Sequence, residues 1–90
     1  MFNQEKFDAA VKAIKYERKF QDELWGDKFD DGGWSPAEWL VFIETYVEKA
    51  KSSLLGCDDM ADGHHKQMDV MRKIAALAVA AMESKGVVRR

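Results

Sequence analysis

The 90-residue sequence has few of the residues that interrupt helices or cross-link chains: one proline, six glycines and one cysteine. The single cysteine, Cys57, excludes an intramolecular disulfide framework. No apolar run approaches the roughly 18 residues that a membrane-spanning helix needs, and the N-terminal MFNQEKF is unlike a signal peptide. These absences predict a soluble cytoplasmic domain that does not bind a membrane.

The sequence also lacks a large excess of one charge sign, because the formal net charge is only -2. The chain therefore lacks the strongly basic surface that binds nucleic-acid polymers, although a nucleotide held through a metal ion remains compatible with it. Its content of 47% hydrophobic and 33% charged residues is ordinary for a globular protein. A chain this short buries only roughly 60–65% of its unfolded surface, so we expect a thin core.

Three segments show the apolar periodicity of an α-helix, and none shows the alternation of a strand. The apolar positions that this periodicity assigns to buried faces include Phe7, Val11 and Leu24 in the first segment, Leu40 in the second, and Met68, Met71 and Met82 in the third. The predicted helices span about residues 3–25, 36–55 and 65–85, and a flexible tail is predicted at 87–90. Small residues in the AALAVAA run at 75–81 favour a central position for the third helix, because they allow close helix approach.

Local signals mark the helix ends. Asn3 is a plausible N-cap for the first helix. In the SPAE motif, Ser35 stands at the N-cap, Pro36 at the first helical position and Glu38 three residues after the cap, which is the pattern of a capping box. Gly86 is expected to end the third helix.

The second predicted helix has an apolar surface wider than one stripe, because Trp39, Leu40, Phe42 and Tyr46 spread around it. Such a surface on a thin domain is often buried by a second copy. We therefore predict an all-α bundle of three helices that is completed by self-association as a dimer or a larger assembly.

Polar residues interrupt the inward stripe of the first helix. Continuing the apolar spacing from Phe7 places Glu17, Arg18 and Gln21 near the same side. Buried charges cost several kcal/mol per ion unless they are paired. Two hypotheses stay open: a structural salt bridge, or a polar ligand pocket with the loop GDKFDDGGW at its mouth. In the second hypothesis Glu44 and Glu48 line the same pocket, and Arg18 offsets their charges.

Acidic residues on the other helices offer a candidate metal site. Glu44 and Glu48 lie one turn apart, and two carboxylates on one helical edge can hold a divalent ion such as Mg²⁺. Asp69 is a candidate third carboxylate. The alternatives are two solvated glutamates and a surface ion pair between Asp69 and Lys73.

Four stretches together resemble the MazG-like nucleotide pyrophosphohydrolases, in particular the short versions carried by bacteriophages. They are YERKFQDELWG, FDDGGWSPAEW, FIETYVEKA and MRKIAALAVAAMES, and the resemblance covers about residues 16–86. It implies an all-α dimer or tetramer that uses magnesium to cut a nucleoside triphosphate between its α and β phosphates.

The resemblance also implies where metal ligands would lie. Glu44 and Glu48 match the outer acids of the Glu-Glu-x-x-Glu motif, whose middle glutamate is replaced by Thr45. In the second motif, Glu-x-x-Asp, the acids are replaced by Val70 and Lys73, while Asp69 lies one residue away from the first of them.

Three functions follow as hypotheses. The first is binding of a nucleotide or small phosphate ligand with weak or no hydrolysis. The second is an active magnesium-dependent pyrophosphohydrolase that uses Glu44, Glu48 and Asp69, with Glu17 as a further acid. The third is a non-enzymatic module that binds a host protein in the host cytoplasm.

The first hypothesis assigns roles to several further side chains. Direct phosphate contacts would come from Arg18, Lys19 and Lys73, because cations can replace a metal in that role. A base would stack on Trp25 or Trp34.

Overall fold

The computed structural model describes residues 1–25, 33–54 and 60–90. Within these ranges the chain forms three α-helices and no strand: α1 (Gln4–Trp25), α2 (Pro36–Leu54) and α3 (Met60–Lys85). The prediction of an all-α, three-helix fold is confirmed. No helix in the described part of the chain is long and apolar enough to cross a membrane.

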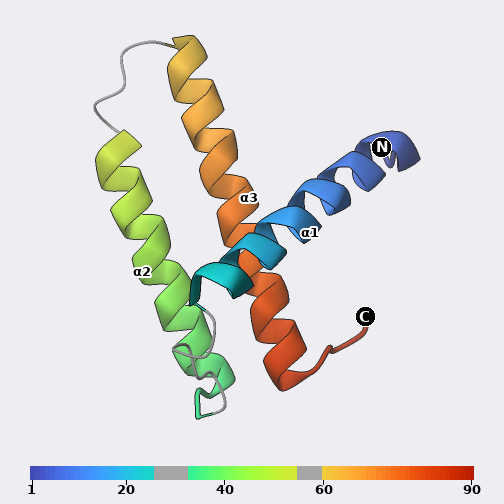
Figure 1. Cartoon of the computed structure of the whole chain (residues 1–90), viewed down its shortest axis with the longest axis vertical. Helices are drawn as coiled ribbons and strands as arrows, with labels where there is room; N and C mark the ends of the chain where they lie inside the picture. The colour runs from blue at the N-terminus through green and yellow to red at the C-terminus, as the bar shows by residue number, and fades with distance from the viewer. Residues whose placement is uncertain (26–32, 55–59) are drawn as a thin grey trace.

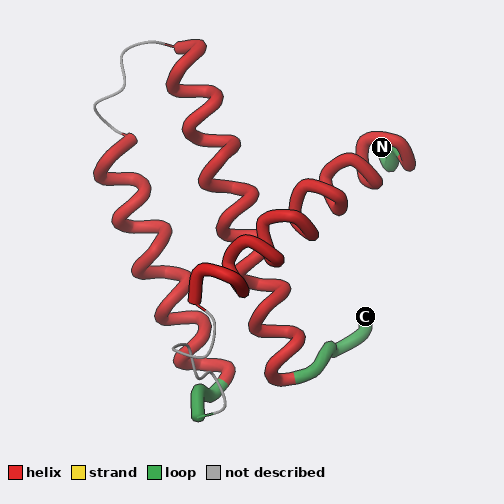
Figure 2. The backbone as a smooth tube through the Cα atoms, viewed as in Figure 1, coloured by secondary structure: helices red, strands yellow, loops and turns green. Residues whose placement is uncertain are grey.

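The central helix is α3, because both other helices pack on it (Figure 1). α2 runs beside α3, whereas α1 crosses α3 near its middle and its first half extends away from the other two helices (Figure 1). Figure 2 shows the same arrangement as a tube, with short non-helical segments before α2 and after α3.

The predicted caps are formed. At the start of α1, the Lys6 amide donates to the Asn3 side-chain oxygen at 3.0 Å. At the start of α2, the Ser35 amide donates to Glu38 Oε1 at 3.0 Å, and the Glu38 amide donates to Ser35 Oγ at 3.2 Å. This reciprocal pair satisfies two backbone donors that a helix start leaves free.

The third helix differs from its prediction at one end. It begins at Met60, whereas the sequence placed its start near His65 and treated the preceding residues as loop. The segment includes Gly63, and glycine costs roughly 1 kcal/mol in a helix interior. In the structure Gly63 is a buried helical residue, so tertiary packing outweighs its propensity.

The other end of α3 is as expected. Gly86 has a φ of 95°, which side-chain-bearing residues rarely adopt, and its amide donates to the Met82 carbonyl at 2.8 Å. The predicted tail at 87–90 is exposed and non-helical.

The apolar core lies between α2 and α3. Trp39 of α2 and Leu77 of α3 are each 1% exposed, and Ala76 and Ala80 are also buried. The Ala-rich run is thus central in the packing, as its small residues predicted. Next to this core the rings of three aromatic residues meet edge to face, with centroids 5.1–6.3 Å apart: Trp34, Trp39 and Phe42.

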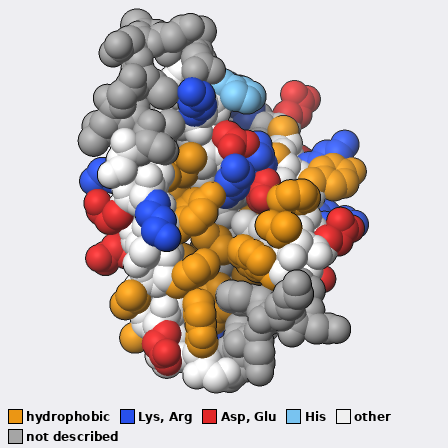
Figure 3. Space-filling model, turned by 60° about the vertical axis from the view of Figure 1, so that its left-hand side comes forward, with side chains coloured by type: hydrophobic (Ala, Val, Ile, Leu, Met, Phe, Trp, Pro, Cys, Tyr) orange, Lys and Arg blue, Asp and Glu red, His pale blue; other side chains and the backbone are white. Residues whose placement is uncertain are grey.

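Much of the expected core is nevertheless exposed. The space-filling view shows hydrophobic side chains gathered on one face, with charged side chains beside them (Figure 3). Exposed residues that the periodicity assigned to buried faces are Phe7, Val11, Leu24, Leu40, Met68, Met71 and Met82. Periodicity identifies an apolar face but not what covers it, and among the described helices neither α2 nor α3 lies along the first half of α1.

Candidate functional site

The second half of α1 carries two buried polar residues where it crosses α3. Glu17 is 8% exposed and Gln21 is 5% exposed. They are four residues apart, so they lie on the same side of the helix. The prediction that this pair lies on the inward stripe is confirmed, and Arg18 beside them is half-buried.

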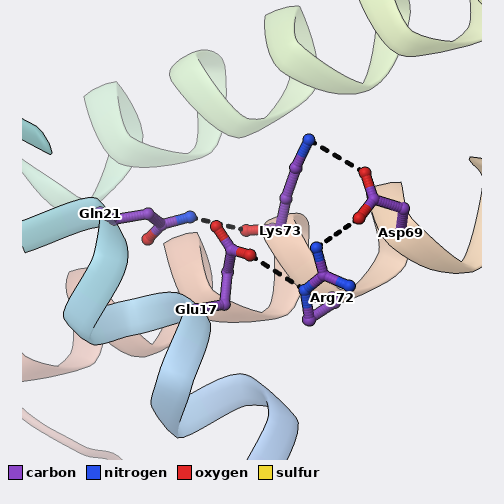
Figure 4. Close-up of polar contacts among 5 residues, drawn as sticks. All are labelled: Glu17, Gln21, Asp69, Arg72 and Lys73. Carbon is purple, nitrogen blue, oxygen red and sulfur yellow. Dashed lines mark hydrogen bonds and ion pairs between the residues drawn. The ribbon is translucent and has the colours of Figure 1, made fainter.

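Both residues contact charged or polar groups of α3 (Figure 4). Glu17 Oε1 accepts a hydrogen bond from Arg72 Nε at 2.9 Å. Arg72 also pairs with Asp69 through Nη2, and Lys73 Nζ lies 3.0 Å from the other Asp69 oxygen. We call these side chains, together with Gln21, the polar cluster: Glu17, Gln21, Asp69, Arg72 and Lys73.

Gln21 completes the cluster on the α1 side. Its Nε2 donates to the Lys73 backbone carbonyl at 3.2 Å. Its Oε1 is buried and accepts no hydrogen bond within the described part of the chain. Most buried side-chain oxygens in proteins accept at least one hydrogen bond, so this oxygen is a point where a donor would be favoured.

The ion pairs stabilise the charged forms of the three titratable residues that α3 contributes to the cluster. The hydrogen bond from Lys73 lowers the pKa of Asp69 below its ordinary value of 3.8, against the opposing effect of burial. The same contact raises the pKa of Lys73. The hydrogen bond to Glu17, and to a smaller extent the hydrogen bond to Asp69, raises the pKa of Arg72. Asp69 is therefore ionised and both cations are protonated at neutral pH.

Arg18 faces a different part of α3. Its Nε and Nη2 donate to the two carboxylate oxygens of Glu83 at 3.1 Å each, and Nη1 lies 3.8 Å from Asp22. The expectation that Arg18 would offset the charges of Glu44 and Glu48 is therefore wrong. Adjacent helical residues point about 100° apart, so Arg18 and Glu17 reach different turns of α3.

The acidic pair on α2 lies at the surface. Glu44 and Glu48 are exposed, and Glu48 has Lys51 at 3.7 Å. Among the residues that the structure describes, no three His, Cys, Asp or Glu side chains come close enough to hold one metal ion. Asp69 instead shares Arg72 with Glu17, and the metal set of Glu44, Glu48 and Asp69 stays a prediction.

The aromatic candidates occupy two other places. Trp34 is half-buried and packs edge-on against Trp39 and Phe42 of α2. Trp25 is half-buried at the end of α1, one turn beyond Gln21. The predicted loop at the mouth of the pocket falls mostly on residues 26–32, and it lies outside the described residues together with Cys57.

Arg72 is the residue that the sequence did not reveal. It stands three residues after Asp69, which is a spacing that permits an ion pair on one helix. Its contact with Glu17, however, depends on how α1 crosses α3, and that crossing is not encoded in any local pattern.

Beyond the polar cluster, α1 and α3 diverge and leave an apolar groove of about 380 Å³. Its α1 wall consists of Ala10, Ala13 and Ile14. Its α3 wall is formed mainly by Met68, Met71 and Ala75, and its polar edge by His65, Asp69 and Arg72.

No family model matches the chain, and neither the curated proteins nor the solved structures include one with significant similarity to it.

Proposed function

We propose that this chain is a MazG-like helical protein that binds a nucleotide or a small phosphate ligand at the polar cluster, with weak or no hydrolysis. The observation that carries the proposal is that two consecutive cations, Arg72 and Lys73, converge on one carboxylate, Asp69. Their side chains are 36% and 38% exposed, so a ligand can reach both.

A phosphate group suits these two cations. The guanidinium of Arg72 offers a planar fork of donors, and the ammonium of Lys73 offers a compact positive charge. A phosphate that displaces the Asp69 carboxylate keeps both cations paired, and the released carboxylate, which is 30% exposed, can be solvated by water. The cluster contains two carboxyl groups and two cations. A bound phosphate therefore competes with the Asp69 carboxylate for Arg72 and Lys73.

The α1 side supplies contacts for the rest of the ligand. Gln21 Oε1 is buried and accepts no hydrogen bond among the described residues, so a ligand hydroxyl or amino group that donates to it would require the Gln21 side chain to turn toward the ligand. Trp25 follows Gln21 by four residues and lies on the same side of α1, where it can stack on a base. These two contacts favour a nucleotide over free phosphate.

Weak hydrolysis follows from the same ion pairs. Metal-assisted attack by water needs carboxylates that fix the ion and orient the nucleophile. A magnesium ion at Asp69 would have to displace Arg72 and Lys73, which stabilise its charged form. Glu17 is likewise held by Arg72.

One observation favours the alternative of an active magnesium-dependent pyrophosphohydrolase. Glu17 and Asp69 come from different helices and meet on the same guanidinium, so two carboxylates already converge on one point. Magnesium in place of Arg72 would be held by both groups. In this alternative Glu44 and Glu48 supply further carboxylates, as the MazG-like motif implies.

The decisive experiment measures binding and turnover together. Thermal stabilisation and calorimetry with the common nucleoside triphosphates, with and without Mg²⁺, should show binding and little pyrophosphate release. Lys73→Gln should weaken binding by about tenfold or more, because it removes one charged contact. Lys49→Gln, on the exposed surface of α2, is the matched control and should leave binding unchanged.

Two results would overturn the proposal in different directions. Pyrophosphate release that requires Mg²⁺ and disappears in Asp69→Asn would establish the enzymatic alternative. Absence of binding by every nucleotide and by inorganic phosphate would leave the host-protein module as the better hypothesis.

A further inference from the structure

The apolar groove between α1 and α3 opens directly onto the polar cluster. Asp69 and Arg72 line the groove, and the same two side chains pair with each other inside the cluster. Figure 1 shows that α1 and α3 diverge from their crossing, and the groove lies between the diverging halves. A ligand held by Arg72 therefore has an apolar surface next to it.

The groove has the size and lining of a small-molecule site. Its volume of about 380 Å³ falls within the roughly 300–1,000 Å³ of ligand pockets, which combine apolar walls with a few polar groups. The apolar walls consist of aliphatic side chains and methionines: Ala10, Ala13, Ile14, Met68, Met71 and Ala75. None of the described residues that line it is aromatic, so it offers no ring on which a flat base would stack. Methionine is flexible and polarisable, and it adapts to the shape of an aliphatic chain.

The charged end of the groove favours an anion. Arg72, Lys73 and Asp69 are each between 30% and 38% exposed, whereas Glu17, the other carboxylate of the cluster, is buried. The charged groups of the cluster that reach solvent are therefore two cations and one carboxylate. Their net positive charge attracts an anionic head group to the end of the groove.

The groove and the residues proposed to contact a base lie on opposite sides of the cluster. Along α1, Ala10 and Ala13 precede Glu17, whereas Gln21 and Trp25 follow it. A nucleotide that extends from the cations toward Trp25 leaves the groove empty. The groove therefore fits a different substituent on the phosphate.

We propose that the polar cluster and the groove together bind a phosphate monoester that carries a single aliphatic chain, either alkyl or isoprenoid. The phosphate pairs with Arg72 and Lys73, and the chain lies along Met68 and Met71. This inference rests on the proposed phosphate binding at the cluster and names its substrate class. The groove accommodates one chain between two helices, so the ligand is a soluble monoester and not the surface of a lipid bilayer.

Calorimetry with a series of n-alkyl phosphates tests the chain. The probes are ethyl, butyl, hexyl and octyl phosphate, each below the concentration at which it forms micelles. Complete burial of one methylene group strengthens binding about fourfold, and a groove open on one side should give about twofold. Octyl phosphate should therefore bind about 60-fold more tightly than ethyl phosphate. Saturating inorganic phosphate should displace both, because all three share the two cations.

Three variants separate the two ends of the ligand. Met68→Ser removes part of the groove wall and should weaken octyl phosphate binding by about fivefold, with ethyl phosphate unchanged. Met82→Ser is the matched control: it changes another exposed methionine of α3, on the side of α2, and should affect neither probe. Lys73→Gln should weaken both probes by the same factor, about tenfold, because the head group and the chain contribute independently. Circular dichroism checks that each variant keeps its helix content.

The same measurements show which proposal fails. Equal affinities for ethyl and octyl phosphate would overturn the apolar subsite but leave the proposed phosphate binding intact. Octyltrimethylammonium that binds as tightly as octyl phosphate would also overturn the subsite, because the groove would then take any amphiphile. Absence of binding by inorganic, ethyl and octyl phosphate would overturn both proposals. Binding to vesicles that contain phosphatidic acid, without binding of octyl phosphate, would overturn the soluble ligand in favour of a lipid surface.

Discussion

α1 and α2 both pack on α3, but through contacts of opposite character. The α2 side is apolar, with Trp39 and Leu77 almost completely buried. The α1 side is polar, and its inward residues Glu17 and Gln21 bind the side chain of Arg72 and a backbone carbonyl of α3. One central helix therefore presents two chemically different surfaces to its neighbours.

The two contacts with α3 have different roles: one mainly stabilises the fold, and the other mainly sets the position of α1. Apolar burial has no preferred direction and contributes in proportion to the area removed from water. Ion pairs lose solvation when they form and give less net stability, but their geometry is specific. We infer that the α2–α3 contact supplies most of the free energy of folding, whereas the α1–α3 contact sets the crossing point of α1.

The strongest test of this comparison removes the centre of the apolar side. Trp39→Ala should lower the free energy of unfolding by about 3–5 kcal/mol, because it deletes a large buried side chain and leaves a cavity. Urea denaturation followed by circular dichroism at fixed protein concentration measures the change. Trp34→Ala, at a half-buried ring beside it, should cost clearly less; equal costs would show that the core is not centred on Trp39.

The polar side should respond less to the same kind of change. Glu17→Gln should cost about 1–2 kcal/mol, because it removes the charged acceptor of a hydrogen bond while Arg72 keeps Asp69 and partial access to solvent. Asp22→Asn, at a side chain that is 76% exposed, is the control and should cost under about 0.5 kcal/mol. A loss for Glu17→Gln as large as that for Trp39→Ala would contradict the division between stability and position.

The same division explains how much the sequence predicts. Signals within one helix succeeded: the Ser35–Glu38 capping box, the stop at Gly86, and the inward positions of Glu17 and Gln21. Each depends only on residues a few positions apart. Prediction of the apolar side also succeeded in outline, because small residues in the Ala-rich run allow close packing by any neighbour.

Predictions of contacts between residues on different helices were less successful. Arg72 was missed and Arg18 was assigned to the wrong carboxylates, because charged partners are fixed by the crossing of α1 on α3. Phe7 and Val11 were expected in a core, but they lie on the part of α1 that neither α2 nor α3 covers within the described residues. The polar contacts between α1 and α3 are therefore the features that the sequence predicts least well. They are also the contacts that define the polar cluster.

Acid should weaken the polar side before the apolar side. Contact with Lys73 lowers the pKa of Asp69 below 3.8 in the folded chain. A lowered folded pKa contributes stability above the unfolded value, and that stability is lost as the pH falls through the folded pKa. The contribution should be under about 1 kcal/mol, because the side chain is 30% exposed and its charge is screened.

Comparison of the wild type with Asp69→Asn measures this contribution. The difference between their free energies of unfolding should be constant near neutral pH and should vanish as the pH falls below 3.8. Trp39→Ala provides the contrast, since its cost involves no titrating group. A difference between wild type and Asp69→Asn that persists at low pH would mean that Asp69 acts through packing.

The smallest effect is expected at the outer edge of α2, which belongs to neither contact with α3. Glu44 is exposed and lies one turn before Glu48, which has Lys51 nearby. Glu44→Gln relieves a like-charge repulsion of about 0.2–0.5 kcal/mol, so it should be neutral or slightly stabilising without a ligand. Thermal unfolding with and without Mg²⁺ checks this and also separates the functional alternatives. If Mg²⁺ stabilises the wild type but not Glu44→Gln, Glu44 is part of a metal site. If both chains respond equally to Mg²⁺, Glu44 does not bind the metal, and ligand binding by Arg72 and Lys73 remains the better explanation.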